Sequence, residues 1–93
     1  MLAQGAGSLL PARELLGDML MELARPAEAL KEYEASQRRE PNRYRGLYGA
    51  GLAAANAGDS AKAKQYFARL VEMAGKGEPR ADVAKARAYL ASN

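Results

Sequence analysis

The sequence predicts an all-α domain of antiparallel helix–turn–helix repeats, with two repeats followed by one capping helix. Two observations predict it. Ala, Leu, Glu, Lys and Arg dominate the chain, and these residues favour helix. The second is a repeat with a period of 34 residues, the length of a helix–turn–helix solenoid unit. Small and aromatic residues return at the same offsets in its two copies: Gly17, Ala29 and Tyr33, then Gly51, Ala63 and Phe67.

The first repeat holds two predicted helices, at about 8–23 and 26–39. Ser8 can cap the first helix, because its hydroxyl accepts from free amides in the first turn. Pro26 fits the first position of the second helix, and Pro41 stops it, because the residue before a proline disfavours the helical region.

The second repeat is followed by a loop and a last amphipathic helix. Asn42 is expected to cap a helix to about residue 57, whose many glycines make it depend on packing rather than propensity. Gly58 and Asp59 end that helix and cap the next one, at about 60–75. Pro79 then opens a helix to about residue 91, placed to cover the open end of the array.

The 93 residues make one small domain, with a flexible lead-in at 1–9 and the folded part at 10–91. We place repeat 1 at about 10–43, repeat 2 at about 44–77 and the capping helix at about 79–91. The chain has no Cys and no His, which removes thiolate sites, zinc sites of the usual kind and Ser–His nucleophiles. We therefore predict no enzyme, no metal and no cofactor.

No run of apolar residues is long enough to cross a membrane. The N-terminus lacks the basic stretch of a signal peptide, so the cytoplasm is the default compartment; a periplasmic location stays open if a longer parent chain carries a signal upstream. The net charge of +3 is too weak to indicate nucleic acid.

The two copies resemble the tetratricopeptide repeat family. The pattern of that family is matched in the first copy by Leu16, Gly17, Ala29, Tyr33 and Pro41, and in the second by Leu47, Gly51, Ala63 and Phe67. The departures are Arg13, Leu20, Ser36, Ala50, Ala54, Leu70 and Gly75. The resemblance covers about residues 10–75 and implies a right-handed superhelix. The ending looks like the C-terminal end of a longer bacterial repeat protein.

The resemblance also implies a concave groove where such proteins hold peptides. Its candidate residues here come from the first helix of each repeat: Glu14, Asp18, Met21, Glu22, Arg45, Tyr48, Leu52, Ala55 and Asn56. Glu14, Asp18 and Glu22 recur at every fourth position and so share one helix face. The groove is therefore expected to be acidic on one side and apolar on the other, and to prefer basic or apolar segments. The same three carboxylates have no implied pocket or electrophile, which argues against acid–base catalysis.

Two other patterns have competing interpretations. Four arginines surround the turn at Pro41, and we interpret them as a solvated turn rather than a nucleic-acid patch, because nothing extends them into a stripe. Residues 49–54 fit a dinucleotide-binding string, but no apolar strand precedes them, and close helix packing is the better interpretation.

The helix predicted at 8–23 carries more apolar residues than one packed face needs. Its surplus residues either dock on a preceding repeat, form a homo-oligomer interface or are covered by the lead-in: Leu9, Leu10, Leu15 and Met19. The sequence thus predicts a non-catalytic protein-interaction or assembly module that binds a peptide or protein. The alternatives are the structural cap of a longer solenoid, a homo-oligomerisation module and, less favoured, a nucleic-acid accessory.

Overall fold

The computed structural model describes residues 12–41, 43–75 and 80–92, and this part of the chain is all-helical, with five helices and no strand. The helices are α2 (Ala12–Glu22), α3 (Pro26–Arg39), α4 (Tyr44–Asn56), α5 (Ser60–Ala74) and α6 (Ala81–Ser92). The predicted bounds of α3 are confirmed. The other predicted helices differ from the observed bounds by a few residues where both ends are described.

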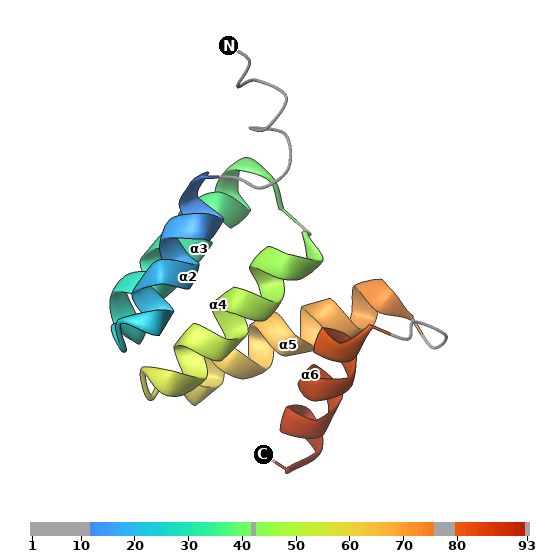
Figure 1. The fold of residues 1–93 in the computed structure, drawn as a ribbon. Helices are drawn as coiled ribbons and strands as arrows, with labels where there is room; N and C mark the ends of the chain where they lie inside the picture. Colours follow the sequence, from blue (N-terminus) through green and yellow to red (C-terminus); the bar gives the residue numbers. More distant parts are fainter. Residues whose placement is uncertain (1–11, 42, 76–79, 93) are drawn as a thin grey trace.

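Consecutive helices pack against one another along the chain, so that α2 lies on α3, α3 on α4, α4 on α5 and α5 on α6. Figure 1 shows α2, α4 and α6 along one side, with α3 behind α2 and α5 behind α4. The helices α2 and α4 also contact each other, as do α4 and α6. The odd-numbered and even-numbered helices therefore form two layers.

Aromatic rings packed on glycines bring these layers together. A Cβ on Gly17 of α2 would lie 2.8 Å from the Tyr33 ring, and one on Gly49 of α4 would lie 2.5 Å from the same ring. A Cβ on Gly51 would likewise lie 2.6 Å from the ring of Phe67. The glycines thus let α2 and α4 approach the rings of α3 and α5, and this close approach offsets their low helix propensity.

The core runs through every helix interface between α3 and α6. Its buried apolar residues are Ala29, Leu30, Tyr33, Leu47, Ala50, Ala53, Ala54, Ala63, Phe67, Leu70, Val83 and Ala86. All the predicted packing residues in α3, α4 and α5 belong to this core or lie beneath its rings. The predicted cap of α5 is confirmed as well, because Asp59 Oδ1 accepts a hydrogen bond from the Lys62 backbone N–H at 3.1 Å.

Leu16 matches the family pattern and was expected to be a repeat-packing residue, but its side chain is 42% exposed. The residue 34 positions later, Ala50, is fully buried where α4 packs on α3. The helix α4 packs on the helix that precedes it, α3, but no helix among the described residues precedes α2 and packs on it. Leu9, Leu10, the lead-in at 1–9, the Asn42 cap and the start of the last helix at Pro79 lie outside the described residues.

Candidate functional site

The predicted groove lies along α2 and α4, and the structure changes its character at Glu14. This carboxylate was expected on an exposed acidic face, but it is fully buried. Its Oε2 atom accepts hydrogen bonds from Arg43 Nε at 2.9 Å and from Ser36 Oγ at 3.3 Å. A Cβ on Gly46 would lie 2.8 Å from the same oxygen, so only glycine lets the first turn of α4 cover the carboxylate.

Burial of Glu14 corrects the prediction that it lines a binding surface. A buried carboxylate needs a charged partner and hydrogen bonds, because removal from water costs several kcal/mol. Arg43 supplies the charge and Ser36 a second donor. Glu14 Oε1 has no hydrogen-bond partner among the described residues. The pair therefore joins α2, α3 and the start of α4, and it has a structural role.

Asp18 is also occupied within the chain. It accepts a hydrogen bond from the Tyr33 hydroxyl at 2.6 Å and forms an ion pair with Arg45 of α4. Burial, followed by this hydrogen bond, raises the pKa of Tyr33 well above its ordinary value, so its hydroxyl stays protonated and donates. Asp18 and Arg45 lie at the predicted surface, but each compensates the charge of the other.

The expected acidic side of the groove is therefore mostly neutralised. Of the three carboxylates predicted there, Glu14 pairs with Arg43 and Asp18 pairs with Arg45. Glu22 is exposed and forms no ion pair with another described residue. The carboxylate of Glu22 is thus the one negative charge of this predicted set that a partner can reach uncompensated.

Of the predicted groove residues, the structure places Met21 and Asn56 at one hollow. We give the name α2–α4 surface to the residues of the predicted groove that are not paired within the chain: Met21, Glu22, Tyr48, Leu52 and Asn56. Tyr48, Leu52 and Asn56 recur at every fourth position of α4 and so form one row. Leu52 is 37% exposed, whereas Tyr48 is half-buried with its ring centroid 5.9 Å from that of Phe67. Ala55 is also half-buried beside this row.

A hollow of about 410 Å³ lies at one end of the α2–α4 surface. Met21 of α2 and Asn56 of α4 line it together with Ala24 and Pro26. Ala24 lies just after α2 in a left-handed conformation, with φ of 60°, and Pro26 begins α3 two residues later. Met21 and Pro26 give the hollow an apolar wall, and the Asn56 amide can both donate and accept hydrogen bonds.

Sequence reasoning missed three contributors to this side of the molecule. Pro26 was interpreted only as the first position of a helix and Ala24 was not singled out, and their place beside Asn56 follows from the packing of α2 on α4. Tyr89 of α6 packs on the aromatic neighbour of Tyr48, with its ring centroid 5.0 Å from that of Phe67. The 34-residue period gives no signal for Tyr89, because the loop before α6 is longer than the loop before α4.

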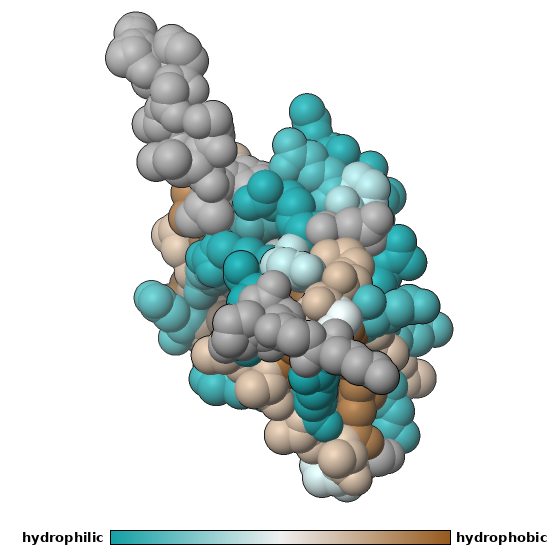
Figure 2. All heavy atoms as spheres, turned by 90° about the vertical axis from the view of Figure 1, so that its right-hand side faces the viewer, coloured by the Kyte–Doolittle hydropathy of each residue, from teal (hydrophilic) through white to brown (hydrophobic). Residues whose placement is uncertain are grey.

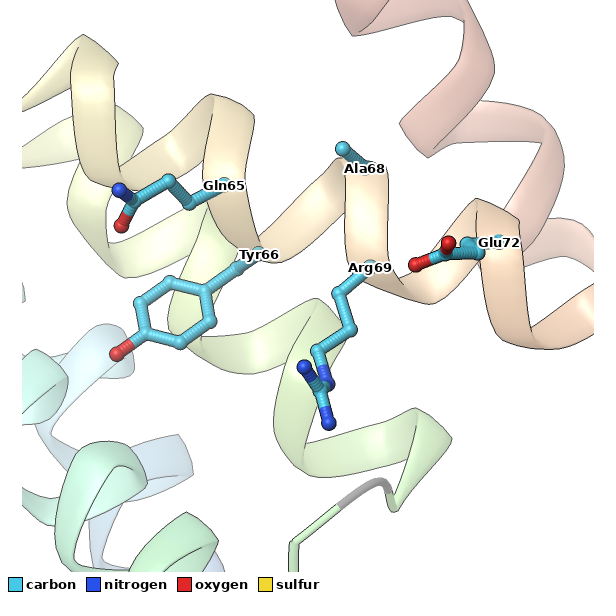
Figure 3. A pocket seen from close by; sticks show the side chains of 5 residues that line it. All are labelled: Gln65, Tyr66, Ala68, Arg69 and Glu72. Atoms are coloured by element: carbon cyan, nitrogen blue, oxygen red, sulfur yellow. The ribbon is translucent and has the colours of Figure 1, made fainter.

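A second hollow, of about 420 Å³, lies on the other layer of the molecule. Figure 3 shows its lining residues along α5 alone, with Tyr66 and Arg69 pointing to the same side and Ala68 on another edge. Tyr66 donates a hydrogen bond to Glu34 at 2.6 Å, and Lys62 pairs with the same carboxylate at 2.9 Å. Its lining side chains do not converge on one point, so this hollow is a weaker candidate.

The charges of Glu34 and its neighbours have a structural explanation. Burial acts to raise the pKa of Glu34, but the hydrogen bonds from Tyr66 and Lys62 outweigh it, so the pKa lies below its ordinary value. Glu34 is therefore ionised at neutral pH, and its partners hold α5 against α3. Nothing in this arrangement supplies an acid and a base with separated pKa values.

The basic turn is compensated in a similar way. Arg43 pairs with Glu14 and Glu40, and Arg45 pairs with Asp18, whereas Arg38 and Arg39 are exposed. Within the described ranges, no group of three or more His, Cys, Asp or Glu side chains is placed to hold a metal ion. No described helix is both long and apolar enough to cross a bilayer.

No protein-family model matches this chain, and searches of curated proteins and of solved structures gave no significant match.

Proposed function

We propose that this chain is a non-catalytic protein-interaction module of the tetratricopeptide type, which binds a peptide or protein segment on the α2–α4 surface. The observation that carries the proposal is the placement of exposed Leu52 in one row with Asn56, beside the hollow that Met21 and Asn56 share. Apolar contact area with a few orienting polar groups is the usual composition of a peptide-binding surface.

The internal repeat supports the fold part of this proposal. Tyr33 packs on Gly17 and Phe67 packs on Gly51, so the two copies use the same contact 34 residues apart. Ala29 and Ala63, which are also one period apart, are both fully buried. Each copy is a pair of helices, α2 with α3 and α4 with α5. These contacts are the ones that the resemblance to the family predicts.

The rigidity of the platform supports the binding part. Arg45 and Asp18 link α4 to α2, and Arg43 reaches Glu14 beneath them. A surface held by packing and by cross-helix pairs loses little conformational entropy when a ligand binds. Because Glu14 and Asp18 are paired with arginines, Glu22 is the carboxylate that can attract a basic residue of the ligand. The preferred ligand therefore combines an apolar residue with a basic one.

The experiment is a selection from a library of random 12-residue peptides, followed by titration of the selected peptide with fluorescence anisotropy. Leu52→Glu is expected to weaken binding at least about tenfold, since it replaces apolar contact area with a charge. Ala68→Glu, at an exposed position of α5, is the matched control and should leave the affinity unchanged. Equal loss in both variants, or no selected peptide at all, contradicts the proposal.

A second candidate function is the structural end of a longer helical array, and the placement of α6 favours it. Val83 and Ala86 of α6 are fully buried where α6 packs on α5, as Leu47 and Ala50 are where α4 packs on α3. Four residues after Val83 stands Arg87, whereas Gly51 stands four residues after Leu47.

Arg87 leaves no glycine surface on which the aromatic ring of a following helix can pack, and its guanidinium donates to the Gly75 carbonyl at 2.5 Å. If α6 serves only to end the array, its role is to stabilise the helices before it. Truncation after residue 75 is then expected to abolish cooperative unfolding, whereas Leu52→Glu leaves unfolding intact. A cooperative transition in the truncated chain, measured by circular dichroism, argues against the terminating role.

A further inference from the structure

Outside the α2–α4 surface, the exposed surface that the structure describes has an apolar part and a cationic part. The apolar part lies on α2, where Leu15 and Met19 are exposed. The cationic part lies on α3 and α5, in the other layer of the molecule. Charge specifies the kind of partner more narrowly than apolar area does, because a cationic surface selects anions.

The carboxylate of Glu34 joins α3 to α5 at the centre of the cationic part. Its Oε2 atom accepts a hydrogen bond from the Tyr66 hydroxyl at 2.6 Å and pairs with Lys62 Nζ at 2.9 Å. Both partners come from α5, one turn apart. Lys62 compensates the charge of Glu34, so a further cation beside this pair leaves a net positive charge.

Arg38 is such a cation, one turn after Glu34 on α3. Burial acts to raise the pKa of both Tyr66 and Glu34, and the Arg38 guanidinium acts against this rise in both cases. Both effects require the guanidinium to lie within electrostatic reach of the two groups. Arg38 is exposed and forms no ion pair with another described residue.

Arg69 supplies a second exposed guanidinium from α5. Figure 1 shows α3 and α5 both running opposite to α4, so these two helices run in the same direction. Glu34 of α3 meets Lys62 and Tyr66 of α5. One turn later on each helix stand Arg38 and Arg69. Figure 3 shows Arg69 pointing to the same side as Tyr66, so one arginine from each helix lies near this tyrosine.

The carboxylates around this end of the two helices leave its positive charge in place. Glu28 and Glu32 of α3 pair with arginines that precede the helix. Glu40, just after α3, pairs with Arg43. Glu72 is the one carboxylate of α5 and lies one turn beyond the cationic part. Figure 2 shows hydrophilic side chains gathered at its upper right, at the height at which α3 ends in Figure 1.

We propose that α3 and α5 bind an acidic segment of a partner protein. The binding residues form what we call the α3–α5 cationic surface: Arg38, Lys62, Tyr66 and Arg69. Each guanidinium presents several N–H donors in one plane, which matches the two oxygens of a carboxylate. Arg38 and Arg69 supply these donors, while Lys62 keeps the neighbouring Glu34 compensated. The surface lies in the other layer from the α2–α4 surface, so both surfaces can be occupied at the same time.

The small extent of the α3–α5 cationic surface favours an acidic peptide over a nucleic acid. A nucleic-acid strand brings one phosphate charge about every 3.4 Å, and its binding requires a longer cationic stripe. The two arginines lie between the carboxylates of Glu34 and Glu72, which a long polyanion would meet. An acidic peptide can set two carboxylates against the two arginines, because side chains on one face of an extended segment recur at every second residue.

The test is a titration of the full chain with a labelled peptide of alternating Glu and Gly, followed by fluorescence anisotropy at about 50 mM salt, where exposed charges are weakly screened. We expect saturable binding that Arg38→Glu and Arg69→Glu each weaken at least about fivefold, because each change replaces an attraction with a repulsion. Lys85→Glu, at an exposed position of α6, makes the same change in net charge and is the matched control. It should leave the affinity unchanged.

Glu72→Gln provides a variant whose effect cannot come from unfolding. It should raise the affinity about twofold or more, because it removes the carboxylate beside the surface. The absence of saturable binding, or equal losses in Arg38→Glu and Lys85→Glu, overturns the proposal. An unchanged affinity in Glu72→Gln overturns the placement of the ligand at Arg69. A single-stranded oligonucleotide of equal charge is titrated in parallel, and tighter binding of it than of the peptide would overturn the choice of an acidic protein segment.

The two proposed surfaces fail separately in these experiments. Leu52→Glu should leave the affinity for the Glu–Gly peptide unchanged while it weakens binding of the peptide selected on the α2–α4 surface. Arg38→Glu should have the opposite pattern. A loss of both ligands in either variant would contradict the assignment of the ligands to separate surfaces.

Discussion

Removal of the Arg43 guanidinium is expected to destabilise the fold far more than removal of the similar Arg45. Arg43→Met leaves the fully buried carboxylate of Glu14 with Ser36 as its remaining described hydrogen-bond donor. Breaking a fully buried ion pair from one side costs about 3–5 kcal/mol. The Arg43 side chain is 33% exposed, so water screens part of the pair, and we expect about 2–3 kcal/mol.

That loss is large for a domain of this size. A chain of 93 residues is expected to have a free energy of unfolding of about 5–14 kcal/mol. The midpoint of thermal unfolding of Arg43→Met should therefore fall by roughly 10–20 °C. The assay is urea denaturation followed by circular dichroism at the helix band, with thermal unfolding as a second measurement.

Arg45→Met is the matched control, because it removes the same group from an ion pair whose two side chains are 45% and 32% exposed. Exposed pairs contribute about 0–1 kcal/mol. The double variant Glu14→Gln with Arg43→Met should recover part of the loss, since no buried charge then lacks a partner. Equal destabilisation by Arg43→Met and Arg45→Met would show that the buried Glu14 carboxylate does not depend on Arg43 for its charge compensation.

Three further predictions concern packing, pH and ligand choice. Gly49→Ala should lower the free energy of unfolding by about 1–2 kcal/mol, because the new Cβ would lie 2.5 Å from the Tyr33 ring. This loss is expected although alanine favours helix over glycine by about 1 kcal/mol. Urea denaturation measures the change, and a variant more stable than the original chain would be inconsistent with the close packing. The pKa of the Glu34 carboxyl is lower in the folded chain than in the unfolded chain, so its contribution to stability is present above the unfolded pKa and is lost as the pH falls through the folded pKa. Glu34→Gln should therefore flatten the acid side of a plot of the free energy of unfolding against pH. An unchanged slope would show that the hydrogen bond from Tyr66 does not lower this pKa. Glu22→Lys should reverse the preference of the α2–α4 surface from basic to acidic peptides in anisotropy titrations, and an unchanged preference would exclude Glu22 from selection.

The fold could be predicted from the sequence where local signals and the repeat agree. Proline at the start of α3 and Asp59 before α5 set helix ends that the structure confirms. Tyr33 and Phe67 were recognisable as packing residues because each is matched by a residue of similar size one period away. Both are in the core.

The binding surface could be predicted only in part. The four-residue spacing of Glu14, Asp18 and Glu22 places them on one helix face, but it does not say that the first turn of α4 covers Glu14. That cover depends on Gly46, whose lack of a side chain was interpreted as a general packing feature. Leu16 is exposed although its counterpart one period later, Ala50, is buried. Ala50 packs against the helix that precedes α4, whereas the described part of α2 contacts no preceding helix.

Amide chemical-shift mapping shows whether a peptide binds along α2 and α4. The selected peptide is titrated into the isotope-labelled full chain, and the perturbed amides are located on the structure. We expect the largest changes at Met21, Glu22, Leu52 and Asn56, with small changes along α5. Perturbations centred on Tyr66 and Arg69 of α5, or spread evenly over the chain, would contradict it.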